Sequence, residues 1–175
     1  MSKHLDGLDP AFRAAVEATI AECAAAGLIM SPYVGARSPA EQARLWRRSR
    51  STSEIMSAVG TLRAAGAAWL AGVLDGVGAQ ATGPEVTRAL PGLSWHQHGL
   101  AVDCVPLVGG KAVWDDARLW TIYRAAAKRH GLFPASVRQP AFDRPHVQAR
   151  ADSPQAATTW RQIDAAMQAR WGAAP

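Results

Sequence analysis

The chain has 175 residues and a net charge of +5, and 49% of its residues are hydrophobic. This length and composition are typical of one globular domain that buries its own core, and they leave little room for a second domain. No run approaches the roughly 20 apolar residues that a membrane-spanning helix needs, so we expect no membrane insertion.

The N-terminal part predicts a helix and no leader segment. The first ten residues, MSKHLDGLDP, lack the apolar centre of a secretory signal. Asp9 is suited to cap a helix that begins at Pro10 and ends near Gly27. Apolar residues recur at helical spacing and form one face of this helix: Phe12, Val16, Ile20 and Cys23.

The chain contains two cysteines, Cys23 and Cys104. Two cysteines are too few for a disulfide framework, and their spacing matches no zinc-binding pair. We therefore expect both to be reduced thiols, buried in the core.

The following stretch predicts a short strand and a helix with a clear start. Residues 28–34 have the composition of a strand, which Ser31-Pro32 interrupts. Ser38-Pro39-Ala40-Glu41 is a capping box with proline at its favoured place, so we expect a helix from about Pro39 to Arg48. The basic run Arg47-Arg48-Ser49-Arg50 leaves two interpretations open: it offsets the dipole at the end of this helix, or it belongs to a binding patch for an anionic partner.

The middle of the chain predicts a long helix, a loop and a buried strand. The apolar helix is expected from about Ser53 to Val77, although its glycines weaken it. Residues 76–91 are rich in glycine and proline and predict a loop. Residues 100–105, L-A-V-D-C-V, have the pattern of a buried strand, and Gly109-Gly110 predicts a hairpin turn that follows it.

The C-terminal part predicts a helix, a strand and a last helix. The first of these is expected from about Asp116 to His130. Residues 141–148 have the pattern of a short strand, and Ser153-Pro154 opens a helix that ends near Gly172. The chain is therefore expected to have an α+β fold, with helices packed around a small antiparallel sheet, in a single catalytic domain over residues 1–175.

His96 and Asp103 carry the first candidate chemistry. They are seven residues apart, and a turn at Gly99 would let a loop residue and a strand residue converge on one point. Asp103 is flanked by Val102 and Cys104, so its carboxylate lies in an apolar segment where burial without a partner is costly. A metal ion would make this burial favourable. An aspartate that caps a neighbour at a strand end is the alternative interpretation.

The second candidate pair is Asp143 and His146, in the stretch F-D-R-P-H-V. Pro145 biases Arg144 toward an extended conformation, so this piece is not helical. Residues three apart in a flat strand face opposite sides. Asp143 must therefore lie in the bend before the strand if both residues serve one site.

Residues 94–103, S-W-H-Q-H-G-L-A-V-D, resemble the S-x-H-x-x-G-x-A-x-D motif of the zinc D-alanyl-D-alanine carboxypeptidase and L-alanyl-D-glutamate endopeptidase family. Residues 143–146, D-R-P-H, are similar to the second motif of that family, and residues 36–42 and 86–92 resemble two upstream elements. The order and spacing of all four agree. One departure is Asp143, where many relatives have Glu, although the endopeptidase branch includes Asp at this place. Another is the long insert at about residues 51–77.

The resemblance implies one zinc ion per chain, bound in a cleft by three ligands: His96, Asp103 and His146. It implies Asp143 as the catalytic base and Arg37 as a residue that binds a substrate carboxylate. Gln42 and Ser94 are expected either to support the ligands through hydrogen bonds or to contact the substrate, and a purely structural hydrogen bond is an equal interpretation for Ser94. His98 is expected at the rim of the cleft and not as a fourth ligand.

The resemblance implies a zinc peptidase that cuts the stem peptide of peptidoglycan, closest to phage endolysins. We expect it to hydrolyse the L-Ala–D-Glu bond, and the D-alanyl-D-alanine carboxypeptidase reaction is the alternative in the same family. The alternatives from other classes are a non-catalytic cell-wall-binding or metal-storage module and, on charge alone, a nucleic-acid binder. An intact ligand set with an acidic base speaks against a non-catalytic module.

The expected setting is that of a lysin. We expect a monomer whose partner is peptidoglycan, with no nucleic-acid partner. A protein made in the cytoplasm without a signal peptide would act on the wall after release, through a holin-type pore.

Overall fold

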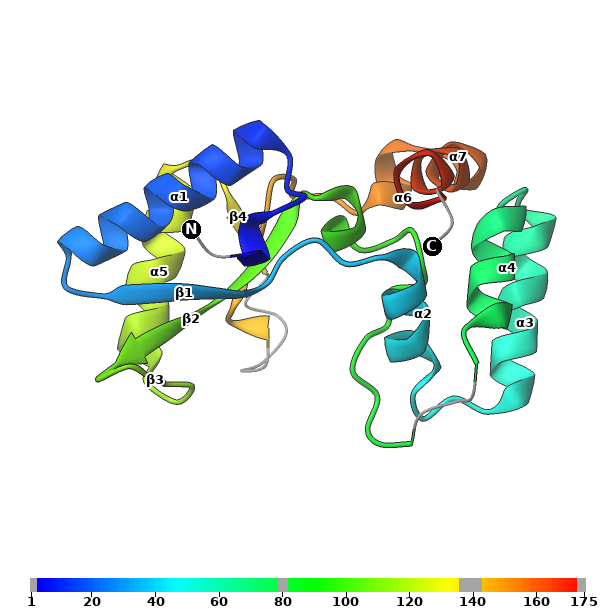
Figure 1. The fold of residues 1–175 in the computed structure, drawn as a ribbon, viewed down its shortest axis with the longest axis horizontal. Helices are drawn as coiled ribbons and strands as arrows, with labels where there is room; N and C mark the ends of the chain where they lie inside the picture. The colour runs from blue at the N-terminus through cyan, green and yellow to red at the C-terminus, as the bar shows by residue number, and fades with distance from the viewer. Residues whose placement is uncertain (1–2, 79–81, 136–142, 173–175) are drawn as a thin grey trace. The chain divides into compact units, whose positions relative to one another are not determined.

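The computed structural model describes residues 3–78, 82–135 and 143–172. Its contacts divide the chain into two compact units. The first, here named the sheet unit, consists of Met1–Ala36 and Gly99–Ala151, and the second, the helical unit, consists of Arg37–His98 and Asp152–Pro175. Figure 1 draws both units as ribbons and labels the helices α1 to α7 and the strands β1 to β4.

The sheet unit is built on antiparallel strands. Its elements, in chain order, are η1 (Lys3–Leu5), α1 (Pro10–Ala25), β1 (Ile29–Val34), β2 (Ala101–Val108), β3 (Lys111–Ala112), α5 (Ala117–Arg129), β4 (Phe133–Pro134) and β5 (His146–Gln148). The strands lie in the order β1-β2-β5-β4, with β3 paired to β2, and every pairing is antiparallel. The predicted α+β class with a small antiparallel sheet is confirmed.

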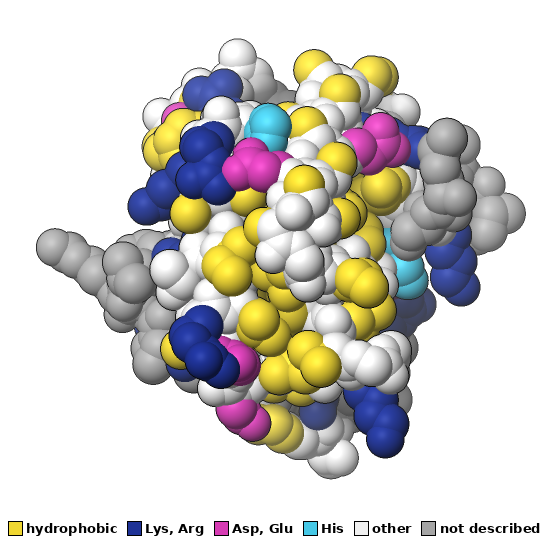
Figure 2. All heavy atoms as spheres, turned by 90° about the vertical axis from the view of Figure 1, so that its left-hand side faces the viewer, with side chains coloured by type: hydrophobic (Ala, Val, Ile, Leu, Met, Phe, Trp, Pro, Cys, Tyr) yellow, Lys and Arg dark blue, Asp and Glu magenta, His cyan; other side chains and the backbone are white. Residues whose placement is uncertain are grey.

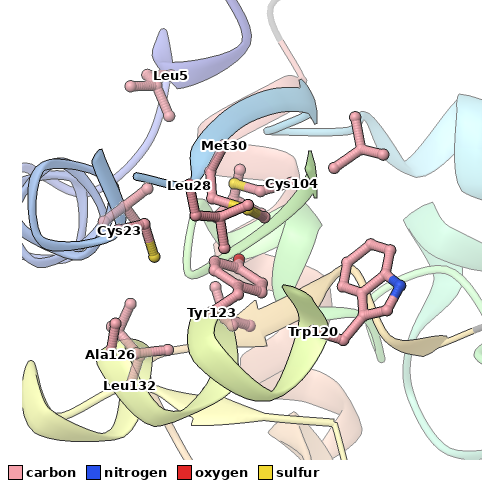
Figure 3. Packing of buried hydrophobic residues seen from close by; sticks show 14 of the residues in the cluster. Leu5, Cys23, Leu28, Met30, Cys104, Trp120, Tyr123, Ala126 and Leu132 are labelled. Carbon is pink, nitrogen blue, oxygen red and sulfur yellow. The ribbon is translucent and has the colours of Figure 1, made fainter. Parts of the chain in front are cut away.

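The core of the sheet unit lies between α1, α5 and the sheet. The two helices contact each other, and the strands meet them through Val102, Cys104 and Val147. Figure 3 shows Cys104 and Tyr123 inside this packing. Cys23 and Cys104 are free and buried, as expected, and burial raises the pKa of the Cys104 thiol to about 12. Both cysteines therefore act as small apolar side chains.

The helical unit has a separate apolar core. Its elements are α2 (Pro39–Arg47), α3 (Thr52–Ala64), α4 (Ala68–Gly76), η2 (Trp95–His98), α6 (Pro154–Ala157) and α7 (Trp160–Trp171). Leu62, Leu70, Leu74, Ile163 and Met167 are buried between α3, α4 and α7.

Several helix ends follow the predicted chemistry. Asp9 accepts hydrogen bonds from the first backbone N–H groups of α1. Ser38 and Glu41 form the expected capping box at the start of α2. The loop expected after α4 is also present, because residues 77–78 and 82–91 contain no helix or strand.

Two predicted helices are wrong in their extent. The single helix expected over residues 53–77 is two helices, α3 and α4, because Gly66 breaks it with a φ of 82°, a conformation that does not continue a right-handed helix. The last helix is also two, because Thr159 starts α7 with a capping box of its own. Of the strand expected at residues 141–148, the structure has His146–Gln148, and residues 141–142 lie outside the described residues.

The surface carries scattered positive charge. Figure 2 shows Lys and Arg side chains distributed around the visible face and not gathered in one patch. In the basic run, Arg47 donates to two backbone carbonyls near the end of α4, and Arg50 stacks on the Trp46 ring at 4.1 Å. These contacts favour the structural interpretation of the run. No helix in the described part of the chain is long and apolar enough to cross a membrane.

We predict that Asp164 stabilises the helical unit as a cap supplied from another helix. The N-cap position of α4, Ala67, offers no side-chain hydrogen bond. Instead the Asp164 carboxylate on α7 accepts from the backbone N–H groups of Leu70 at 2.8 Å and Trp69 at 3.4 Å. Asp164→Ala should lower the free energy of unfolding by about 1 kcal/mol, the usual cost of a lost cap.

Urea denaturation followed by circular dichroism measures this cost. Asp115→Ala, at an exposed position, is the matched control. Equal stability of the two variants would contradict the capping role of Asp164.

Candidate metal centre

Asp103 and His146 lie opposite each other on neighbouring strands of the sheet unit. The β2–β5 register pairs Asp103 with His146 and Val102 with Val147. Side chains alternate between the two faces of a sheet, and Val102 and Val147 belong to the core under α1 and α5. The carboxylate and the imidazole therefore share the opposite face, away from that core.

The Asp103–His146 pair is close and largely buried. The Nδ1 atom of His146 lies 3.1 Å from Oδ1 of Asp103, and each side chain is 16% exposed. Burial lowers the pKa of His146, but the hydrogen bond and charge of Asp103 act in the other direction, with smaller contributions from Gln148 and Asp143, so the pKa is raised overall. The surroundings of the His146 ring thus favour a positive charge at this place.

Asp143 lies in the turn before β5, as the spacing required. Its side chain is partly buried. Its negative charge is one of the causes that raise the pKa of His146, so the carboxylate lies within electrostatic reach of the ring. Asp143 is therefore near the Asp103–His146 pair.

His96 lies on the short helix η2 of the helical unit and is only 4% exposed. The backbone around it is held by donors from distant parts of the sequence. The backbone N–H of Arg37 donates to the carbonyl of His96 at 3.2 Å, and the indole of Trp171 donates to the carbonyl of Gln97 at 2.9 Å. The position of His96 is therefore defined by α7 and by the start of the helical unit.

Side chains of η2 itself complete this network. Oε1 of Gln97 accepts from the backbone N–H groups of Gly92 and Ser94, so the backbone of Ser94 is part of the scaffold. His98 forms a hydrogen bond with the carbonyl of Gly92 at 3.0 Å and contacts the Trp95 ring edge-on. Burial lowers the pKa of His98, which agrees with a neutral, structural histidine.

Arg37 and Gln42 are joined to each other. The guanidinium of Arg37 donates to Oε1 of Gln42 at 3.0 Å. Gln42 is fully buried, and its amide nitrogen donates to Thr87 and to the carbonyl of Ala89. The amide of Gln42 thus links Arg37 to the loop before η2, and the Gln42 side chain is not exposed to solvent.

Among the described residues, one group of metal-binding side chains could hold an ion: His96, Asp103 and His146. They are the three residues that the family resemblance implied as ligands. His98 does not belong to this group. Two imidazoles and a carboxylate form a donor set that is common in catalytic zinc sites, which keep one coordination position open.

Two residues around these ligands were not foreseen from the sequence. Gln148 lies 2.9 Å from Nε2 of His146, and strand alternation was a signal that could have found it, because residues two apart share a face. The sequence carries no signal for the contact of Trp171 with Gln97, because the two residues are 74 positions apart.

A comparison with curated proteins finds no match. A solved structure of a Glu-to-Ala variant of the vancomycin-resistance D,D-pentapeptidase VanY, from a VanB-type cassette and in complex with Zn(II), matches with a TM-score of 0.48 and 15% identity. The match covers 89% of this chain and 83% of that chain.

The family model described as D-alanyl-D-alanine carboxypeptidase (VanY) matches residues 6–124. The matched residues include His96 and Asp103 and end before Asp143 and His146. Because the match extends over more than half of the chain, the chain belongs to the VanY family of D-alanyl-D-alanine carboxypeptidases.

Proposed function

We propose that the chain is a zinc-dependent peptidase that hydrolyses the stem peptide of peptidoglycan, and that residues 1–175 act as one catalytic domain. The observation that carries the proposal is the pairing of Asp103 with His146 on the sheet face away from the core. His96 is the proposed third ligand of a single zinc ion.

Chain connectivity supports His96 as the third ligand. Only Gln97 and His98 separate it from Gly99, where the sheet unit resumes, so His96 and Gly99 are at most about 11 Å apart. Gly99 has a φ of 72°, which glycine adopts without strain. This supports the turn that the sequence predicted between the histidine and the aspartate.

The proposed mechanism assigns the proton to Asp143. A bound zinc ion supplies Lewis acidity, which polarises the scissile carbonyl and lowers the pKa of water toward about 7. The Asp143 carboxylate accepts the proton of the attacking water and passes it to the leaving amine. Its place in the turn before His146 and its effect on the pKa of that ring support this role.

Arg37 is proposed to bind a carboxylate of the substrate, which a guanidinium can do through paired hydrogen bonds. Its backbone is bonded to the carbonyl of His96, so it belongs to the same scaffold as a proposed ligand. Gln42 is buried and bonded to Arg37, and we assign it the task of holding that guanidinium in place. Ser94 keeps its proposed role as a substrate contact through its hydroxyl.

The bond that is cut is proposed to be L-Ala–D-Glu. Both candidate substrates offer a carboxylate, because the terminal D-Ala has one and D-Glu, linked through its side chain, keeps its α-carboxylate. The support for L-Ala–D-Glu is Asp143, which the endopeptidase branch has where many relatives have Glu. The D-alanyl-D-alanine carboxypeptidase reaction is the second candidate, because the matching family model carries that description.

An endolysin-like role agrees with the proposed bond. Cutting next to the glycan detaches a whole stem, whereas removal of a terminal D-Ala leaves the existing mesh intact. We propose a monomer that acts on the wall after release through a holin-type pore. A non-catalytic wall-binding module would bind peptidoglycan without producing new ends, so digestion separates that alternative from both enzymes.

We predict that His146→Ala removes zinc and activity together, because two ligands are too few to retain the ion. Elemental analysis of the purified variant measures the zinc content. His130→Ala is the matched control, since His130 is bonded to Glu22 on the surface of the sheet unit. Full zinc occupancy in His146→Ala would disprove the ligand assignment.

We predict that Asp143→Asn retains zinc but loses at least about 10²-fold in kcat, because an amide cannot accept the proton of water. Zinc content and turnover are measured on the same preparation. Asp115→Asn, at an exposed position, should behave like the parent protein. A variant with Asn at position 143 and the parent rate would rule out this base.

We predict that digestion of purified peptidoglycan releases free stems whose D-Glu amino group is newly exposed, while the glycan keeps L-Ala. Mass spectrometry of the new amino and carboxyl ends identifies the bond. The metal-free protein is the blank. Release of free D-alanine alone, with an intact mesh, would replace the endopeptidase by the carboxypeptidase, and no new ends at all would favour the binding module.

A further inference from the structure

We propose that Gln148 is a positioning residue that fixes the tautomer of His146, so that Nδ1 binds the metal ion and Nε2 keeps its proton. The inference rests on the zinc site of the proposed function and adds to it which ring nitrogen is the ligand. Asp103, His146, Gln148 and Arg150 all belong to the sheet unit.

Strand geometry brings the amide of Gln148 to the ring. His146 and Gln148 are two residues apart on β5, so both side chains lie on the face of the sheet that Asp103 shares. Nε2 of His146 is 2.9 Å from Oε1 of Gln148. The residue paired with Gln148 on β2 is Ala101, whose methyl group is too small to compete for this space.

The direction of the Gln148 amide follows from its second partner. The amide nitrogen donates to the backbone carbonyl of Arg150. A carbonyl can only accept a hydrogen bond, so the amide nitrogen faces Arg150 and the amide oxygen faces His146. The oxygen of Gln148 can only accept in turn, and Nε2 of His146 must therefore carry a proton.

This arrangement leaves Nδ1 for the metal. Nδ1 faces Oδ1 of Asp103 at 3.1 Å, and in the metal-free protein a proton between these two atoms joins two groups that are both proposed ligands. On binding of a zinc ion, Nδ1 of His146 and Oδ1 of Asp103 would release that proton to solvent and hold the ion instead. The proton on Nε2 stays with Gln148, which keeps the ring in one orientation for the metal. A ligating histidine commonly needs such an acceptor for its other ring N–H.

Substitution of Gln148 tests the proposal through zinc affinity. Gln148→Leu removes the acceptor at similar size and should weaken zinc binding roughly 10- to 100-fold, the usual effect of losing a partner of a ligating histidine. Gln148→Glu keeps an acceptor oxygen and should bind zinc about as tightly as the parent protein. Gln155→Leu, at an exposed position on α6, is the matched control. Competition with a chromophoric chelator measures the dissociation constants.

Nuclear magnetic resonance of the unsubstituted protein gives a second, independent test. Long-range ¹H–¹⁵N correlations of the His146 ring should show a proton on Nε2 and none on Nδ1 in the zinc-loaded protein. This readout does not depend on whether Gln148→Leu folds. Zinc on Nε2, or a Gln148→Leu variant that folds and binds zinc like the parent, would overturn the role of Gln148.

Different results would refute the zinc site and the positioning role of Gln148. If the parent protein binds no zinc, or His146→Ala binds it equally well, the zinc site itself is wrong. If zinc is lost in His146→Ala while Gln148→Leu keeps the parent affinity, the zinc site stands and only the positioning role of Gln148 is refuted.

Discussion

The register between β2 and β5 is the constraint on which the candidate site depends. It pairs Asp103 with His146 and, one position along, Val102 with Val147. A slip of one residue would exchange the two faces, placing the carboxylate in the core and a valine in the site. The burial of Val102 and Val147 against α1 and α5 therefore maintains both the stability of the sheet and the geometry of the proposed ligands. The same alternation brings Gln148 to the ring of His146.

The electrostatics of the two sheet faces differ for a physical reason. On the core face, burial raises the pKa values of Cys104 and Tyr123, so both side chains stay neutral. The Tyr123 hydroxyl donates to the carbonyl of Pro145 at 3.3 Å, which ties the residue before His146 to α5. On the other face, a largely buried carboxylate meets an imidazole, and a cation there offsets the cost of desolvating the carboxylate. A chain that places Asp103 in an apolar strand thus favours a positively charged partner at this point.

Within the helical unit, hydrogen bonds to the backbone hold the segment that carries His96. The backbone N–H of Arg37 and the indole of Trp171 donate to successive carbonyls of η2, and the amide of Gln97 accepts from the turn that precedes it. Because these bonds hold the main chain, they orient the histidine without using its ring nitrogens. Arg37, the proposed substrate contact, is bonded to the same helix, so one short segment carries a proposed ligand and holds the backbone of a proposed substrate contact.

The sequence by itself determined the features that depend on neighbouring residues. The caps at Asp9 and Ser38, the hairpin at Gly109-Gly110 and the turn at Gly99 depend on residues within a few positions of one another, and the motifs identified the three proposed ligands. The sequence did not predict the helix break at Gly66, because glycine is also tolerated inside a helix. Only the tertiary structure decided the β2–β5 register, the burial of Gln42 and the contact of Trp171 with Gln97. These depend on hydrogen bonds and packing between segments distant in the chain, whose partners are set by the folded backbone and leave no periodic or local signature in the order of residues.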